Sequence, residues 1–300
     1  NKLFVTGVVA TSLLTFTACN DFLDLEPPSN VTPEAYFQND EQLGAYSIAR
    51  YTSLFTTPSG WGQGNIINGD AATDNMAATS PNASRFTKDL WLVPHSGDLG
   101  FGDIRYCNYF FEQVLPRYES GFYNSYPDAG HYIGEMYFLR AWVYYSRLRT
   151  YGDYPIVSEL VEDNKDDLIA HGTRMPRNEV ADFILADLDR AIELLNDKGF
   201  MANNRINKQV ALLAKSRVAL YEASYERYHR GTGRVPGDEG WPGFSVHPGY
   251  SFDVDAHVSD LLTQAMDAAK QVADNIELTQ NTMVLDQDPA SPGTGWNPYF

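Results

Sequence analysis

The segment at residues 128–151, DAGHYIGEMYFLRAWVYYSRLRTY, places apolar and aromatic side chains at intervals of three to four residues. That interval is the period of an α-helix with one buried face. Gly152 and Pro155 follow the segment and are typical of a helix end. The segment therefore predicts a long helix with an aromatic face, and it favours a mainly α-helical fold.

Further segments show helix-start signals or the same period. At Thr32-Pro33-Glu34, threonine can cap a helix, proline suits its first position, and glutamate complements the helix dipole. The other predicted helices have apolar stripes, and Asn178 is the expected cap of the helix over residues 178–195. We predict helices over residues 33–55, 103–117, 178–195, 208–228 and 255–275, an extended piece over 155–160 and an acidic loop over 161–167.

The segments 178–195 and 208–228 follow each other closely and are rich in alanine and leucine. Small residues let two helices approach closely, as in tetratricopeptide-like hairpins. The 34-residue tetratricopeptide consensus itself is absent. The fold class we predict is mainly α, with tetratricopeptide-like helical hairpins and long ligand-facing loops.

The expected loops are two long stretches with little helical period. Residues 56–102 are rich in Gly, Ser, Thr, Asn and Asp, and residues 229–254 are rich in Gly and Pro. Connections of this length inside a compact domain are usually functional or disordered. We expect both stretches to face a ligand.

The charge of the chain limits its partners. The net charge is −17, and no run of basic residues occurs, so a nucleic-acid partner is disfavoured. A polyanionic ligand is disfavoured as well, unless a local patch opposes the global field. A neutral ligand or a protein partner fits better.

The N-terminal segment predicts export and anchoring. Residues 1–18 form a secretory signal: Lys2 precedes an apolar run, and Thr17-Ala18 places small residues before Cys19. A cysteine at the cleavage point resembles a bacterial lipobox, which implies a lipid on Cys19. The alternative is an ordinary signal peptide that contains a cysteine. Residues 19–31, with two adjacent prolines, predict an extended tether. We expect the other cysteine, Cys107, to be a buried thiol.

Candidate ligand residues lie in the predicted loops. Aromatic rings stack on the apolar faces of sugars, and neighbouring Asp and Asn side chains bond the hydroxyls. Trp61 is the first choice because Gly60, Gly62 and Gly64 surround it. For each candidate, structural packing or turn formation is the alternative role, and the position of Trp142 inside an apolar helix favours the core. The candidates are Trp61, Asn65, Asp70, Asp74, Asn75, Trp91, Trp241 and Trp296.

Signals for catalysis or cofactors are poor. Asp70 with Asp74, or Asp98 with Asp103, could form a glycosidase pair. In a chain with 39 acidic residues, such pairs arise by chance. The six histidines show no metal-ligand spacing, and no nucleotide-binding or hydrolase motif occurs. We therefore expect no enzyme, cofactor or metal.

Four segments lie in order along the chain: CNDFLDLEPPSNVTPEAYFQNDEQL at 19–43, GEMYFLRAWVYYSRLRTYGDYPIV at 134–157, RNEVADFILADLDRAIELL at 177–195 and INKQVALLAKSRVALYEASY at 206–225. Together they resemble the SusD/RagB family of surface lipoproteins of Bacteroidota, which bind nutrients at the outer membrane. The resemblance implies that residues 32–300 form one helical domain, truncated at its C-terminal end.

The resemblance also implies a function. It implies a glycan-binding lid that faces the cell exterior and delivers an oligosaccharide to a TonB-dependent β-barrel transporter. It places the segment GDAATDN at 69–75 near the glycan site, and it adds a transporter-facing surface as the alternative to the core for Trp142. A peptide-binding or protein-interaction scaffold of the same fold is the alternative.

Overall fold

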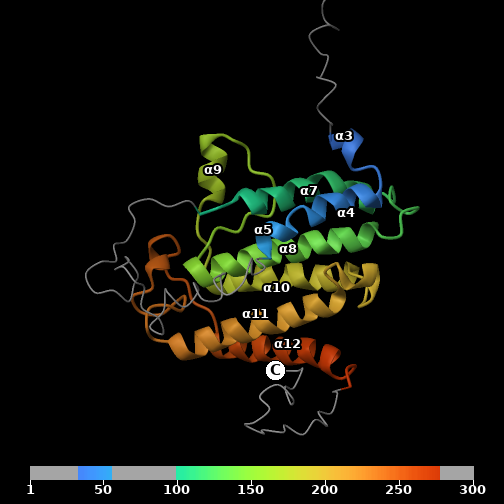
Figure 1. Ribbon diagram of the computed structural model, residues 1–300. Helices are drawn as coiled ribbons and strands as arrows, with labels where there is room; N and C mark the ends of the chain where they lie inside the picture. The colour runs from blue at the N-terminus through green and yellow to red at the C-terminus, as the bar shows by residue number, and fades with distance from the viewer. Residues whose placement is uncertain (1–32, 56–98, 278–300) are drawn as a thin grey trace, which may run out of the picture.

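The computed structural model describes residues 33–55 and 99–277 (Figure 1). Long helices lie side by side in chain order and dominate this part of the chain. They are α7 (Gly102–Glu119), α8 (Ala129–Tyr151), α10 (Arg177–Leu194), α11 (Lys208–His229) and α12 (Val254–Ala273). Among the described residues, the β-structure consists of one isolated bridge between Tyr154 and Met175. The predicted mainly α fold is confirmed.

Helix α8 lies at the centre of the layer. It contacts α4 (Asp40–Ile48), α5 (Tyr51–Leu54) and α7 on one side and α10 on the other. One face of α8 is fully buried, which explains the aromatic and apolar period of this segment; its residues include Ile133, Met136, Leu139, Tyr144 and Leu148. Burial of each such side chain contributes about 1.5–3 kcal/mol.

Helices α10, α11 and α12 follow as neighbouring hairpins. Asn207 caps α11, because its side chain accepts a hydrogen bond from the backbone N–H of Val210 at 3.1 Å. Asp253 caps α12 in the same way through Ala256. Small buried side chains at these contacts let the helices approach closely; they include Ala211, Ala219, Ala223, Ala265 and Ala268.

The N-terminal region differs from the prediction of one helix over residues 33–55. It forms α3 (Pro33–Tyr36), α4 and α5, with breaks between them. At the first break Asn39 is extended, and its side chain caps α4 through the N–H of Gln42. Phe37 is buried there, and its carbonyl accepts bonds from Arg117 and Tyr123. The single-helix prediction was wrong because a cap and a buried aromatic outweigh helical continuity.

Two smaller predictions also differ. The acidic loop ends at Asn164, which caps the short helix α9 (Lys165–His171) through the N–H of Asp167. Asn178 is not a cap, because α10 begins one residue earlier after Pro176. Instead, Asn178 is buried and its amide donates to the Tyr250 hydroxyl at 2.9 Å.

Three buried arginines join elements that are distant in sequence. Arg140 on α8 donates two bonds of 2.7 Å to Asp187 on α10. Arg177 on α10 donates bonds of 2.6 and 2.7 Å to Glu222 on α11. Arg205, just before α11, pairs with Glu135 on α8. Paired charges of this kind restrict which helices can be neighbours.

Cys107 is 1% exposed, as predicted for a buried thiol. Burial raises the pKa of its thiol to about 12. The thiol is therefore protonated and unreactive at neutral pH.

Candidate functional site

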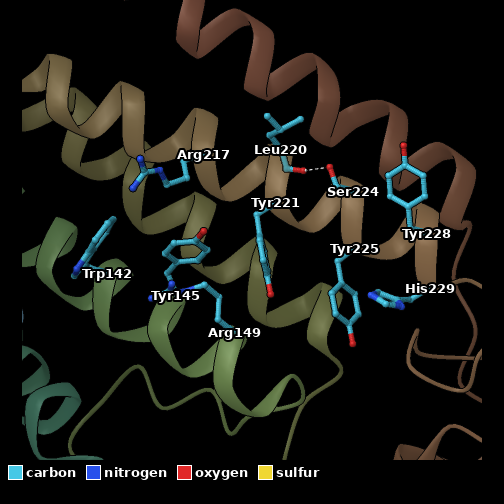
Figure 2. Close-up of a pocket in the computed structure, with 10 residues that line it drawn as sticks. All are labelled: Trp142, Tyr145, Arg149, Arg217, Leu220, Tyr221, Ser224, Tyr225, Tyr228 and His229. Atoms are coloured by element: carbon cyan, nitrogen blue, oxygen red, sulfur yellow. Dashed lines mark hydrogen bonds between the residues drawn. The ribbon is translucent and has the colours of Figure 1, made fainter. Parts of the chain in front are cut away.

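An open groove runs across α8 and α11, with a volume of about 770 Å³ (Figure 2). Its lining is dominated by aromatic side chains and includes two arginines. The lining residues are Trp142, Tyr145, Arg149, Arg217, Leu220, Tyr221, Ser224, Tyr225, Tyr228 and His229. We call this surface the aromatic groove.

Helical spacing creates the groove. Arg217, Tyr221, Tyr225 and His229 are four residues apart along α11, so they form one row on its surface. Leu220, Ser224 and Tyr228 form the adjacent row. On α8, the groove residues are three and four positions apart at Trp142, Tyr145 and Arg149. The groove thus combines two rows from one helix with one row from another.

Five rings in the groove form a continuous ladder. The ring centroids are 5.8 Å apart between Trp142 and Tyr145, and 5.7 Å apart between Tyr145 and Tyr221. The ladder continues at 6.3 Å from Tyr221 to Tyr225 and at 4.3 Å from Tyr225 to His229. Each ring is thereby held by its neighbours, and Figure 2 shows them following one another from α8 along α11.

The ladder is fixed to the core at both ends. The Trp142 ring stacks on Phe138 at 5.9 Å and also contacts Phe55. At the other end, the buried guanidinium of Arg177 lies 3.3 Å from the Tyr225 ring centroid and is held by Glu222. The rings are therefore a preformed surface, and little side-chain freedom is lost when something binds to them.

The charge of the groove opposes that of the chain. No Asp or Glu is among its described lining residues. Arg149 lies over the Tyr145 ring at 4.8 Å, and both Arg149 and Arg217 are exposed. Neither guanidinium has an ion-pair partner among the described residues. The groove is a local cationic patch on a chain with 39 acidic and 22 basic residues.

Trp241 is in a Gly/Pro-rich connection, as predicted, but it is 4% exposed. Its Nε1 donates to Asp153 at 2.9 Å, and its ring packs against Phe244 and Tyr250. This tryptophan was a candidate platform for a sugar, and the structure instead places it in the packing of residues 230–253. Burial leaves it no open ring face in this arrangement.

A second cleft of about 740 Å³ lies beside that connection, between α9 and the short helix η2 (Pro242–Ser245). Leu168 and Ile169 on α9 and Val246 after η2 are exposed on its walls. This cleft has fewer rings than the aromatic groove and consists mainly of backbone turns and aliphatic side chains. The cleft brings the connection between α8 and α10 next to the Gly/Pro-rich segment 229–254.

The other predicted residues lie outside the described residues. They are Cys19, Trp61, Asn65, Asp70, Asp74, Asn75, Trp91 and Trp296. Sequence reasoning missed the aromatic groove, although Arg217, Tyr221, Tyr225 and His229 stand at a regular four-residue spacing. That spacing was the available signal, and it was read only as part of a helical hairpin.

No group of three or more His, Cys, Asp or Glu side chains within residues 33–55 and 99–277 is arranged to hold a metal ion. In the same ranges, no helix is both long and apolar enough to cross a membrane.

The architecture defines a protein of packed helical hairpins with an aromatic groove on one face. A family model described as SusD-like, "starch-binding associating with outer membrane", matches residues 21–220. The chain therefore belongs to the SusD-like family, and the resemblance stated above is confirmed. Members of this family are associated with the outer membrane.

Two relatives come from Formosa agariphila. SusD-like protein P2 is 29% identical over 222 residues, which are 71% of this chain and 40% of the relative. SusD-like protein P38 is 25% identical over 234 residues, 74% of this chain and 43% of the relative. The matched region is thus about two fifths of the length of these relatives.

Solved structures from Bacteroides fragilis are also similar. A SusD-like protein matches with a TM-score of 0.48 and 22% identity, over 67% of this chain and 38% of that chain. A SusD superfamily protein matches with a TM-score of 0.47 and 19% identity, over 82% of this chain and 45% of that chain.

Proposed function

We propose that the protein binds an oligosaccharide at the cell surface and does not act on it as an enzyme. The family match over residues 21–220 carries this proposal. The aromatic groove supports it, because adjoining rings with a few polar groups suit the mixed apolar and hydroxylated faces of sugars. The binding candidates in the loops, from Trp61 to Trp91 and at Trp296, remain part of the proposal.

We further propose a path for the ligand. The protein is anchored in the outer membrane by a lipid on Cys19, faces the exterior, and passes its oligosaccharide to a TonB-dependent β-barrel transporter. The lipobox-like sequence before Cys19 and the proline-containing tether support this arrangement. A lid over a barrel needs both a ligand surface and an attachment to the membrane, and these features supply candidates for both.

Calorimetric titration of the complete protein with neutral and acidic oligosaccharides tests the binding proposal. We expect saturable binding of at least one glycan. Binding of peptides but of no glycan would instead favour the peptide-binding alternative. Release of new reducing ends from a bound glycan, lost when one acid is replaced, would contradict the absence of catalysis.

The anchor has a separate test. Cys19→Ala in the intact gene should move the protein from the membrane fraction to the soluble fraction. The comparison is made in cells that lack the transporter, so that docking cannot retain the protein. Continued membrane association of the variant under these conditions would rule out lipidation as the anchor.

A further inference from the structure

We propose that the aromatic groove binds an extended acidic oligosaccharide, one that carries carboxylate or sulfate groups along a chain of sugar rings. This inference rests on the proposed glycan-binding function and adds a site and a ligand class to it. The site is distinct from the loop candidates named from the sequence.

The ring ladder explains why the ligand is an extended chain. Trp142, Tyr145, Tyr221 and Tyr225 are separated by 5.7–6.3 Å between neighbouring centroids. Tyr145 is 5% exposed and supports the ladder from beneath, whereas Trp142, Tyr221 and Tyr225 are partly exposed along the groove. Several sugars of one chain can therefore contact these three exposed rings in turn. A compact ligand would use only part of the surface.

The two arginines explain why the ligand is acidic. Guanidinium groups bind carboxylate and sulfate oxygens through paired N–H donors. Elsewhere in the described structure, Arg140, Arg177 and Arg205 already donate to carboxylates. Arg149 and Arg217 remain exposed, without an acid in the groove lining. Their N–H groups can therefore bind an anionic ligand. Their positive charge is opposite in sign to the net charge of −17 of the whole chain.

Hydroxyl groups complete the match to a sugar. The Ser224 hydroxyl donates to the carbonyl of Leu220 at 2.7 Å, so its oxygen can still accept a bond from a ligand hydroxyl. Tyr228 is 78% exposed and presents a phenol at the edge of the groove.

An acidic peptide would meet the same arginines, but the rest of the groove fits it less well. Leu220 is the one aliphatic side chain among the described lining residues. Peptide grooves that read side chains use apolar pockets or a sheet edge. This groove offers adjoining aromatic rings instead. The ring surface therefore favours a saccharide.

The first experiment titrates the complete protein and the double variant Arg149→Gln/Arg217→Gln with a galacturonate heptamer, a sulfated galactan heptamer and maltoheptaose. We expect at least one acidic probe to bind, and at least tenfold weaker binding of that probe to the double variant. Arg190→Gln, an exposed arginine on α10 outside the groove, is the matched control and should bind normally.

The outcomes separate the inference from the proposed function. If glycans bind but the double variant is unchanged, or if maltoheptaose alone binds, the groove inference fails while glycan binding stands. If no glycan binds, the proposed function fails as well. A glutamate heptapeptide could also bind as tightly as the acidic oligosaccharides and bind more weakly to the double variant. That result would overturn the assignment of the ligand as a saccharide and favour an acidic peptide.

A second experiment locates the ligand. Leu220 in the groove and Leu213 outside it lie on α11 and are each 51% exposed. Each is replaced by cysteine in the Cys19→Ala protein, where Cys107 is buried, and labelled with a charged maleimide. The bound acidic glycan should slow labelling at position 220 at least fivefold and leave position 213 unchanged. Equal labelling rates with and without glycan, or a position 220 that does not label at all, would overturn the inference.

Discussion

The arginines inside the helical layer and those in the aromatic groove have opposite surroundings. Arg140, Arg177 and Arg205 have buried side chains with carboxylate partners on other elements. Arg149 and Arg217 belong to the same helices or their neighbours, yet they face solvent and aromatic rings. The difference indicates that the interior charges specify how helices pack, whereas the groove charges are available to a partner.

The interior pairs link helices across sequence separations of 45 to 70 residues. Each pair costs desolvation free energy, and its hydrogen bonds offset that cost only while both partners are present. The groove arginines remain hydrated and carry no such cost. Loss of one member of an interior pair should therefore lower the free energy of unfolding strongly. Loss of a groove arginine should lower it only slightly.

The largest effect is expected for Glu222→Ala. The variant leaves the guanidinium of Arg177 buried without its carboxylate, which should lower the free energy of unfolding by about 3–5 kcal/mol. Urea denaturation measures the loss. Glu193→Ala removes an exposed partner from Arg190 and should cost less than about 1 kcal/mol. Equal losses in both variants would contradict the comparison.

A smaller, pH-dependent effect is expected at His257, which joins Glu226 on α11 and Asp182 on α10. Burial lowers the pKa of His257, but hydrogen bonds to Asp182 and Glu226 outweigh it and raise the pKa to about 10. Because the folded-state pKa is the higher one, this stabilisation is complete below pH 6.5 and is lost as the pH rises to about 10.

The measurement is the free energy of unfolding of the wild type and His257→Gln from pH 6 to pH 10. The difference between the two proteins should shrink by roughly 2–4 kcal/mol across that range. Both proteins share the titrating groups that do not contact His257, so the difference reports on His257 together with its partners Glu226 and Asp182. Parallel curves would show that the histidine has no raised pKa.

The third effect concerns Trp241, which donates to the partly buried carboxylate of Asp153. Burial raises the pKa of Asp153, and bonds from the Arg177 backbone N–H and Trp241 oppose that shift. Trp241→Phe keeps an aromatic ring and removes the donor, so it should lower the free energy of unfolding by about 1–2 kcal/mol. Trp142→Phe is the matched control, because the Trp142 indole makes no hydrogen bond to residues 33–55 or 99–277 and the phenyl ring keeps an aromatic contact with Phe138. A larger loss in the control would contradict the interior role of Trp241.

Sequence periodicity predicted the long helices because their buried faces repeat every three to four residues. It did not predict the breaks in residues 33–55, where Asn39 caps α4 locally and the carbonyl of buried Phe37 accepts bonds from Arg117 on α7 and Tyr123 in the turn after it. It also missed α9, whose seven residues are too few to show a period. Local pattern identifies an element, and tertiary contacts decide where a short one begins and ends.

The two tryptophans show why the site was harder to predict than the fold. Trp241 follows glycine and precedes proline, which suggested exposure, but Asp153 from a distant segment holds it in the interior. Trp142 stands in an apolar helix, which suggested the core or a transporter-facing surface; it packs against the core, is partly buried and also lines the groove. The exposure of a tryptophan side chain depends on which elements pack against it. A single sequence does not show which elements these are.

The smallest stability effect is expected for Arg149→Gln/Arg217→Gln, the variant that removes both groove arginines. Both guanidiniums are exposed and unpaired within the described residues, so their loss should change the free energy of unfolding by less than about 0.5 kcal/mol per site. Urea denaturation beside Glu222→Ala gives the contrast directly. A loss above about 2 kcal/mol would mean that the groove arginines hold the fold together. An unchanged stability combined with weakened glycan binding would assign them to the ligand.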